Sequence, residues 1–348
     1  MKIIKAILLS FTIAIIAISI PKTLKVKADS AYGIVVMEKL SGRILFSENE
    51  TEKLPMASTT KILTAITVIE NFDLNKVIEV PSGFKGVEGS SVYLKSGERY
   101  TAKDLLYGLM LRSGNDCAEI LASSFCKRED FILLMNQVAT KFGAKNSNFT
   151  NPHGLHDENH FTTAEDLANI TRFALNNPVF KKIVSTKKYV ATELKSNEKR
   201  FWQNKNKMLF LFDGATGVKT GYTVKAGRCL VSSAERNGME LICVVLNVYD
   251  MFERSKNLLD KAFSEYKLIK LVSKDKFNYK LPDEDLNYHY LYIESDFYYP
   301  IANSEKINIE LNLPKSIKKN HQSKQKVGEI KIYSLKQLIF CQNIYTLK

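Results

Sequence analysis

The sequence places a hydroxyl and an amine three residues apart at the start of an apolar-periodic run. Ser58 and Lys61 lie in the segment PMASTTKILTAITVIENF. If this run is helical, the two residues share one face of the helix, one turn apart. In that geometry the amine can accept the proton of the serine hydroxyl. The spacing therefore predicts nucleophilic chemistry, with Ser58 as the nucleophile and Lys61 as its base.

Two later motifs could complete such a site. Ser113-Gly114-Asn115 interrupts an apolar-periodic stretch in LMLRSGNDCAEILA, and Lys219-Thr220-Gly221 lies in DGATGVKTGYTVKAG. Taken singly, each motif has an ordinary structural interpretation: a helix N-cap followed by a solvated lysine, a polar turn, and an exposed strand end. Their order and wide separation favour three elements that meet around one cleft.

Together, S-x-x-K, S-x-N and K-T-G resemble the signature set of the penicillin-binding proteins and the serine β-lactamases. The flanking segments are most similar to the low-molecular-mass D-alanyl-D-alanine carboxypeptidases. These segments are PMASTTKILTA, LLYGLMLRSGNDCAEILA, NFTNPHGLHDENHFTTAEDLANITRFAL and GVKTGYTVKAGRCLVSSA. The resemblance extends from about Ala31 to about Lys267 and, more weakly, to the C-terminus.

The resemblance implies catalytic roles for the first two motifs. Ser58 would attack the penultimate D-alanine carbonyl of a peptidoglycan stem peptide, and water would later release the acyl-enzyme. Lys61 acts as a base only when neutral, so its pKa must fall well below about 10.4 through burial or a neighbouring cation such as Lys219. Ser113 would relay a proton, and Asn115 would orient Lys61 or bind the substrate backbone.

The third motif would bind the substrate. Lys219 and Thr220 would hold the terminal carboxylate, and Gly221 would leave the strand edge open to an extended peptide. The resemblance also implies an oxyanion hole formed by the backbone N–H groups of Ser58 and Tyr222.

His153, in NPHGLHDE, resembles the family's histidine near the acyl-enzyme, where it would help to position the deacylating water. Hydrogen bonding within a loop is the alternative role. His156, Asp157 and His160 follow without metal-ligand spacing, so we expect them to be loop residues. Arg254, in DMFERSKNLL, is out of register with the arginine that the family often carries there, and it is not assigned to the site. The resemblance implies no metal and no cofactor.

The N-terminus predicts export. Two lysines precede an uncharged run over residues 6–20, and Val26-Lys27-Ala28 is typical of a cleavage site. The run is shorter than the roughly 20 residues that span a membrane as a helix. We therefore favour a cleaved signal peptide over residues 1–28 rather than a membrane anchor, and we predict a mature protein on the wall side of the cytoplasmic membrane.

Composition limits the partners. The formal charge of +13 falls to +8 without the five lysines of residues 1–28. This excess suits either a solvated basic surface or peripheral contact with an anionic wall or membrane, whereas nucleic acid is a poor partner for an exported chain. The five cysteines are odd in number and lack metal-type spacing, so they define no disulfide framework.

Local patterns predict the elements that position the motifs. Residues 31–47 form a hairpin around Ser41-Gly42, and GRCLVSSAER and MELICVVLNV pair around Asn237-Gly238. Helices are predicted from the Ser58 segment, within residues 101–143, in TTAEDLANITRFALN with a threonine cap at 162 or 163, and in SKNLLDKAFSEYK. Strands at both ends with helices between them indicate an α+β fold. Residues 29–270 are thus expected to form a β-lactamase/transpeptidase-like sandwich with a helical insert.

The sequence changes character near residue 271. Short β-rich segments, HYLYIES, KINIELNL and GEIKIYSL, alternate with polar connections such as SIKKNHQSKQK. We predict a small all-β domain over residues 271–348, as in many carboxypeptidases of this family, with a role as a spacer. Family members often end in an amphipathic membrane-anchoring helix; this sequence stops at YTLK, so the mode of attachment stays open.

Two other functions remain open. A class A β-lactamase would share Ser58, Lys61 and Lys219 but needs an added glutamate, and no segment between Asn115 and Lys219 clearly matches its loop. Penicillins are therefore expected to be covalent inhibitors that are turned over slowly. A penicillin-sensing or wall-binding protein without peptide turnover is the second alternative, because fold does not determine function.

Overall fold

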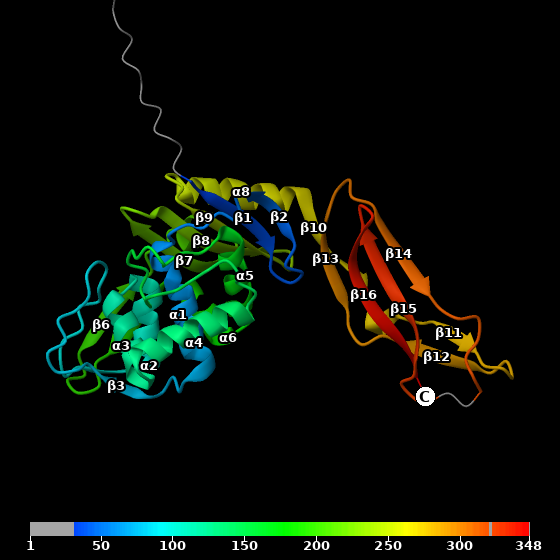
Figure 1. The fold of residues 1–348 in the computed structure, drawn as a ribbon, viewed down its shortest axis with the longest axis horizontal. Coiled ribbons are helices and arrows are strands. Elements are labelled where there is room, and N and C mark those ends of the chain that lie inside the picture. The colour runs from blue at the N-terminus through cyan, green and yellow to red at the C-terminus, as the bar shows by residue number, and fades with distance from the viewer. Residues whose placement is uncertain (1–30, 320–321, 348) are drawn as a thin grey trace, which may run out of the picture. The chain divides into compact units, whose positions relative to one another are not determined.

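The computed structural model describes residues 31–319 and 322–347. A five-stranded antiparallel sheet, ordered β2-β1-β9-β8-β7, gathers strands from both ends of the region that carries the motifs (Figure 1). Its strands are β1 (Gly33–Glu38), β2 (Ile44–Glu48), β7 (Ala215–Thr223), β8 (Gly227–Arg236) and β9 (Met239–Leu246). All the helices before α8 are inserted between β2 and β7, which confirms the predicted α+β sandwich with a helical insert.

Both predicted hairpins are present. In the β1–β2 turn Gly42 has φ +75°, and in the β8–β9 turn Asn237 and Gly238 have φ +51° and +78°. Asn-Gly is the dipeptide that best tolerates two successive positive φ angles, and these match the twist of a two-residue hairpin.

The two faces of the sheet bury different side chains. On β1, Val35 and Met37 join the core formed with the helices of the insert, whereas Ile34 and Val36 join the core formed with α8 (Met251–Glu265). Figure 1 shows α8 along one face of the sheet and the labelled helices of the insert on the opposite face. Every residue of β9 is buried because this central strand is covered on both faces, which explains its unbroken apolar run.

The helical insert carries the first two motifs. Its helices are α1 (Lys61–Asn71), α2 (Ala102–Tyr107), α3 (Asn115–Phe125), α4 (Arg128–Lys141), α5 (Ala164–Ala174), α6 (Pro178–Ser185) and α7 (Met208–Leu211), with a 3₁₀ turn η1 (Ala57–Thr60) and a π-helical turn η2 (Gly108–Arg112). Thr163, rather than Thr162, caps α5, because its side chain accepts a hydrogen bond from the backbone N–H of Asp166 at 3.0 Å.

Two small hairpins within the insert were not predicted. They pair β3 (Val77–Glu79) with β4 (Arg99–Thr101) and β5 (Lys188–Thr192) with β6 (Lys199–Gln203). Both are short and rich in exposed charged residues, so they lack the apolar alternation by which longer strands are recognised.

The predicted all-β region follows α8. Its strands are β10 (Tyr266–Val272), β11 (Lys280–Pro282), β12 (Tyr288–Tyr292), β13 (Phe297–Ala302), β14 (Ile307–Asn312), β15 (Lys326–Ser334) and β16 (Gln337–Thr346), with a short 3₁₀ turn η3 (Lys274–Lys276). β10 pairs with β13, and the others form a sheet ordered β11-β12-β16-β15-β14.

The predicted signal peptide lies outside the described residues. Within the described ranges, no helix is long and apolar enough to cross a membrane.

Candidate active site

Ser58 lies on a tightly held turn. It is the second residue of η1, directly after Ala57, whose backbone has φ +49°. Thr60 Oγ1 donates to the Ala57 carbonyl at 2.9 Å and is 2.8 Å from His160 Nε2. Because His160 Nδ1 accepts the backbone N–H of Thr150 at 3.0 Å, the ring carries its proton on Nε2 and donates it to Thr60. The turn that presents Ser58 is therefore fixed by a chain of hydrogen bonds.

Lys61 is the first residue of α1 and is fully buried. Its Nζ lies 3.0 Å from Ser58 Oγ, 2.6 Å from Asn115 Oδ1 and 2.6 Å from the His153 carbonyl oxygen. The predicted meeting of the first two motifs is thus present in the structure, and the amine has three polar partners within hydrogen-bonding distance.

The chemistry of these partners determines where the lone pair of a neutral amine would point. The His153 carbonyl can only accept, and Asn115 presents its oxygen to Lys61 because its Nδ2 donates to the Glu88 carbonyl. A neutral Lys61 would give one N–H to each of these oxygens. Its lone pair would then face Ser58 Oγ, which is the arrangement that a base needs.

Burial and a second cation favour that neutral form. The pKa of Lys61 is lowered well below its ordinary value, first by burial and then by the charge of Lys219. The pKa of Lys219 is itself lowered to about 7, chiefly by burial and further by Lys205. The expectation that Lys61 needs a depressed pKa, with Lys219 as the neighbouring cation, agrees with these directions.

Ser113 lies at the end of the π-helical turn η2 in the left-handed region, with φ +64°. The helix therefore breaks at the predicted position and restarts as α3 at Asn115. The Ser113 side chain is buried but makes no hydrogen bond to Ser58 or Lys61 among the described contacts. A proton relay through Ser113 would need a substrate or a water molecule to complete it.

The third motif lies on β7, the edge strand beside the serine turn. A Cβ built on Gly221 would stand 3.1 Å from the Ser58 backbone nitrogen, so a side chain here would crowd the serine turn, and glycine favours the close approach of the strand. Lys219 is buried, and its Nζ donates to the Thr220 carbonyl at 2.8 Å. Tyr222 follows Gly221 on the strand, and its side chain is exposed.

His153 has partners that the sequence did not predict. Its Nε2 lies 3.0 Å from Glu119 Oε1, and its Nδ1 accepts the backbone N–H of Leu155 at 3.1 Å. Both ring nitrogens are therefore occupied by protein groups, and the contact with Lys61 is made by the backbone carbonyl.

Two of the remaining polar residues considered from the sequence, Arg254 and His156, lie outside this cluster. Arg254 pairs with Glu48 on β2, and His156 pairs with Glu158 at 2.9 Å on an exposed loop. His160, which was expected to be only a loop residue, supports the serine turn through Thr60, and Glu119, which the sequence analysis did not consider, contacts His153. Neither contact has a local sequence signal, because the partners are brought together only by the fold.

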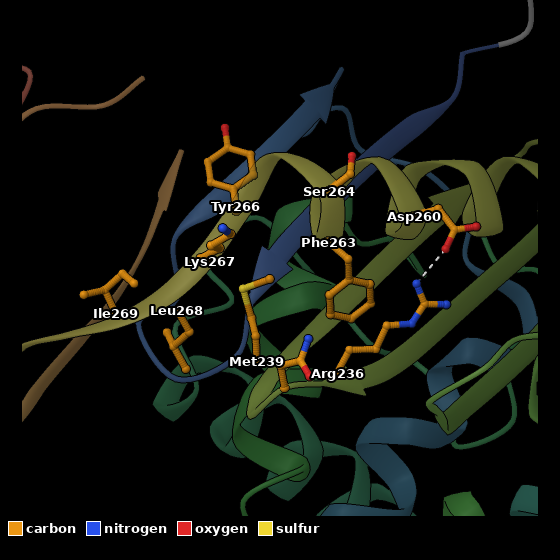
Figure 2. Close-up of a pocket in the computed structure, with 10 residues that line it drawn as sticks. Arg236, Met239, Asp260, Phe263, Ser264, Tyr266, Lys267, Leu268 and Ile269 are labelled. Carbon is orange, nitrogen blue, oxygen red and sulfur yellow. Dashed lines mark hydrogen bonds and ion pairs between the residues drawn. The ribbon is translucent and has the colours of Figure 1, made fainter. Parts of the chain in front are cut away.

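A cavity of about 530 Å³ lies between the β8–β9 turn and the end of α8 (Figure 2). Arg236 bonds Asp260 there at 2.8 Å, and its guanidinium lies 4.5 and 4.9 Å from the ring centroids of Phe212 and Phe263. None of the described residues that line the cavity belongs to the three motifs, so it is separate from the candidate active site.

The fold and the site define a penicillin-binding-protein type of serine enzyme, in which a lysine rather than a histidine adjoins the nucleophile. The sequence matches the D-alanyl-D-alanine carboxypeptidase family over residues 18–250. The chain belongs to this family, as the motifs predicted.

Relatives and solved structures agree. D-alanyl-D-alanine carboxypeptidase DacF of Bacillus subtilis is 33% identical over 259 residues, which cover 72% of this chain and 66% of DacF. DacC of Escherichia coli is 31% identical, with coverages of 76% and 69%. The match thus spans just under two thirds of the length of DacF.

Penicillin binding protein 5 from Haemophilus influenzae superposes with a TM-score of 0.76 at 26% identity, covering 91% of this chain and 96% of that chain. A point mutant of the Streptomyces K15 DD-transpeptidase gives 0.61 at 31% identity, covering 66% and 94%.

Proposed function

We propose that this protein is a serine-type D-Ala-D-Ala carboxypeptidase that removes the terminal D-alanine from peptidoglycan stem pentapeptides. The observation that carries the proposal is the arrangement around Lys61, in which two fixed acceptors direct the amine lone pair at Ser58 Oγ. Family membership supports the substrate class.

Acylation would begin when Ser58 gives its proton to Lys61 and its oxygen attacks the penultimate D-alanine carbonyl. The carbonyl oxygen becomes an oxyanion, which the backbone N–H groups of Ser58 and Tyr222 would stabilise. Collapse of this intermediate breaks the C–N bond. The leaving amine takes a proton from the Lys61 ammonium, directly or through Ser113, and departs as free D-alanine.

Substrate binding would use the open edge of β7. An extended peptide can add to this edge, because the sheet ends there and Gly221 carries no side chain. Protonated Lys219 would pair with the terminal carboxylate, and the Thr220 hydroxyl would donate a hydrogen bond to it. This arrangement favours peptides that end in a free carboxylate.

Water would then cleave the Ser58 ester, with Lys61 again accepting a proton. A β-lactam would be attacked in the same way, but its leaving nitrogen stays tethered to the acyl group and hinders the approach of water. We therefore propose that penicillins acylate Ser58 and are released slowly.

The substrate places the reaction on the wall side of the cytoplasmic membrane. Export would follow from the predicted signal peptide over residues 1–28. The net charge of +8 beyond that segment suits peripheral contact with an anionic wall or membrane surface.

The test is release of free D-alanine from a stem pentapeptide by the purified protein, with Ser58→Ala as the control. Release that disappears in the control is the expected result. If labelled penicillin binds Ser58 but no D-alanine is released, the carboxypeptidase proposal fails and a penicillin-sensing role takes its place. Rapid hydrolysis of penicillin would instead identify a β-lactamase.

A further inference from the structure

The ion pair behind His153 is the starting point. Glu119, on α3, accepts from the His153 ring at 3.0 Å and from Arg128, the first residue of α4, through two hydrogen bonds of 2.8 and 3.0 Å. Burial alone would raise the pKa of Glu119, but the hydrogen bonds and charges of His153 and Arg128 together outweigh it and lower that pKa to about 2. Glu119 is therefore a charged acceptor, held in place by a planar guanidinium.

The His153 ring is locked in one neutral form. Its Nδ1 accepts a backbone N–H from Leu155, so this nitrogen carries no proton, and Nε2 donates its hydrogen to Glu119. Burial lowers the pKa of His153 against the raising effect of Glu119, in agreement with a neutral ring. With both ring nitrogens bonded in this way, the His153 side chain connects α3 rigidly to the loop that contains His153.

The same residue supplies a partner of Lys61 through its backbone. The His153 carbonyl accepts from Lys61 Nζ at 2.6 Å. The peptide units on both sides of His153 are held by Asn151 Oδ1, which accepts from the N–H groups of Gly154 at 2.7 Å and His153 at 3.3 Å. The side chain and the backbone of His153 are thus fixed separately, and together they set the position of the carbonyl.

Helix α3 carries one acceptor of Lys61, Asn115, and contacts the residue that supplies the other, His153. Asn115 and Glu119 are four residues apart and share one helix face. Asn115 bonds the amine directly, whereas Glu119 holds the residue that supplies the second oxygen. We propose that Glu119, braced by Arg128, is a positioning residue that aims Lys61 at Ser58 through His153. This inference rests on the proposed function only in taking Lys61 as the base.

The influence of Glu119 is expected to be geometric rather than a direct charge effect. The charged or titratable groups that act most on Lys61 are Lys219 on β7, Cys117 and Asp116 on α3, and Lys205. Glu119 is not among these, although it stands on the same helix. Losing a direct negative charge would lower the pKa of Lys61, whereas loosening its surroundings would admit water and raise that pKa toward its ordinary value.

The experiment measures acylation of the full-length protein by benzylpenicillin as a function of pH, separating initial binding from the bond-forming step. The variants are Glu119→Ala and Glu119→Gln, because glutamine keeps an oxygen for His153 but cannot form the charged pair with Arg128. Glu129→Gln is the matched control, since Glu129 is an exposed carboxylate in the first turn of α4.

We expect Glu119→Ala to slow the bond-forming step about tenfold and Glu119→Gln about threefold. The affinity of initial binding and the fraction of protein molecules that penicillin can acylate should stay unchanged. The acid limb of the profile should move to higher pH in both variants and stay in place in Glu129→Gln.

Two results would overturn the inference. One is a wild-type rate and acid limb in Glu119→Gln, even if Glu119→Ala fails to fold. The other is a smaller fraction of protein that penicillin can acylate, with no change in the acylation rate of the molecules that do react. That result would assign Glu119 a purely structural role. Penicillin acylation is measured apart from D-alanine release, so failure of the carboxypeptidase proposal gives a different pattern.

Discussion

Lys61 Nζ has three polar partners, the same number as the protons of an ammonium group. The site can therefore hold this side chain in either its charged or its neutral form. As a cation, the amine can donate to Ser58, Asn115 and His153 together; as a neutral base, it keeps the last two donations and frees its lone pair for Ser58. A proton can therefore move between the serine and the lysine without reorganisation of the surrounding acceptors. Such preorganisation is the main way in which a static site lowers a barrier.

Two buried lysines with opposite requirements predict the pH dependence. Acylation should accelerate as pH rises through the lowered pKa of Lys61, because only its neutral form accepts a proton. Affinity should fall above about pH 7, because Lys219 has a pKa of about 7 and must be charged to pair with a carboxylate.

The check is to follow the binding constant and the bond-forming rate for benzylpenicillin separately over about pH 5 to 9. The alkaline loss should reside in the binding constant. An affinity that stays flat through this range would contradict the assigned role of Lys219.

At the scale of elements, the loop before α5 presses against the serine turn. Gly154 in this loop has φ +87°, and a Cβ built there would stand 1.9 Å from the Ala57 carbonyl oxygen. Gly143 has nearly the same φ, +86°, with no atom within 4 Å of such a Cβ. Comparing alanine substitutions at Gly154 and Gly143 therefore separates the effect of backbone strain, present at both, from that of a steric clash, present only at Gly154.

Gly154→Ala is expected to lower the free energy of unfolding by about 3 kcal/mol, and Gly143→Ala by about 1 kcal/mol, since only the first adds a clash to the strain. Because the clash displaces the turn that carries Ser58, Gly154→Ala should also slow penicillin acylation about tenfold. Denaturant titration and acylation rates measure the two effects. Equal losses in both variants would show that the close approach has no consequence.

A buried carboxylate ties the second motif to the segment before it. Asp116 accepts from Ser91 Oγ at 2.5 Å and from the backbone N–H groups of Val92 and Leu94, each at 3.1 Å. This segment also contains Glu88, whose carbonyl orients the Asn115 amide. Asp116 thus holds in place the part of the chain that turns the amide oxygen toward Lys61.

Asp116→Ala should cost about 3 kcal/mol of stability, because it leaves several buried donors without an acceptor. Acylation should slow as well, through the loosened Asn115. Asp130→Ala, at an exposed position on α4, is the control and should change either quantity little. Thermal denaturation measures the stability, and penicillin acylation with active-site titration measures the rate per folded molecule. If that acylation rate equals the wild-type rate, Asp116 contributes only to stability.

Elements with local signals were predictable, and long-range pairs were not. The β1–β2 and β8–β9 hairpins, the helix break at Ser113 and the cap of α5 follow from turn residues and periodicity. Helix α6 was missed although Asn177 caps it and Pro178 opens it, a pairing that the sequence displays. Glu119 could not have been assigned, because its partner His153 lies 34 residues away and only tertiary packing brings the two together.

At the scale of the whole molecule, the described residues form separate apolar cores. Two cores cover the faces of the motif-bearing sheet, and a third contains the buried residues Val272, Leu291, Ile293, Ile330, Ile332 and Ile344. The third core lies entirely after α8, which supports the proposed small β domain. Regions with their own cores are expected to unfold as separate cooperative units.

Calorimetry tests this independence through two perturbations. Acylation by benzylpenicillin should raise only the transition of the catalytic region, because the covalent adduct stabilises the folded state around Ser58. Ile332→Ala removes a fully buried side chain, costs about 3 kcal/mol, and should lower only the other transition by roughly 10 °C or more. Ile309→Ala, at a half-exposed position on β14, is the control and should shift it little. If both perturbations move one shared transition, the β region is a structural part of the catalytic unit, and the proposed spacer role fails.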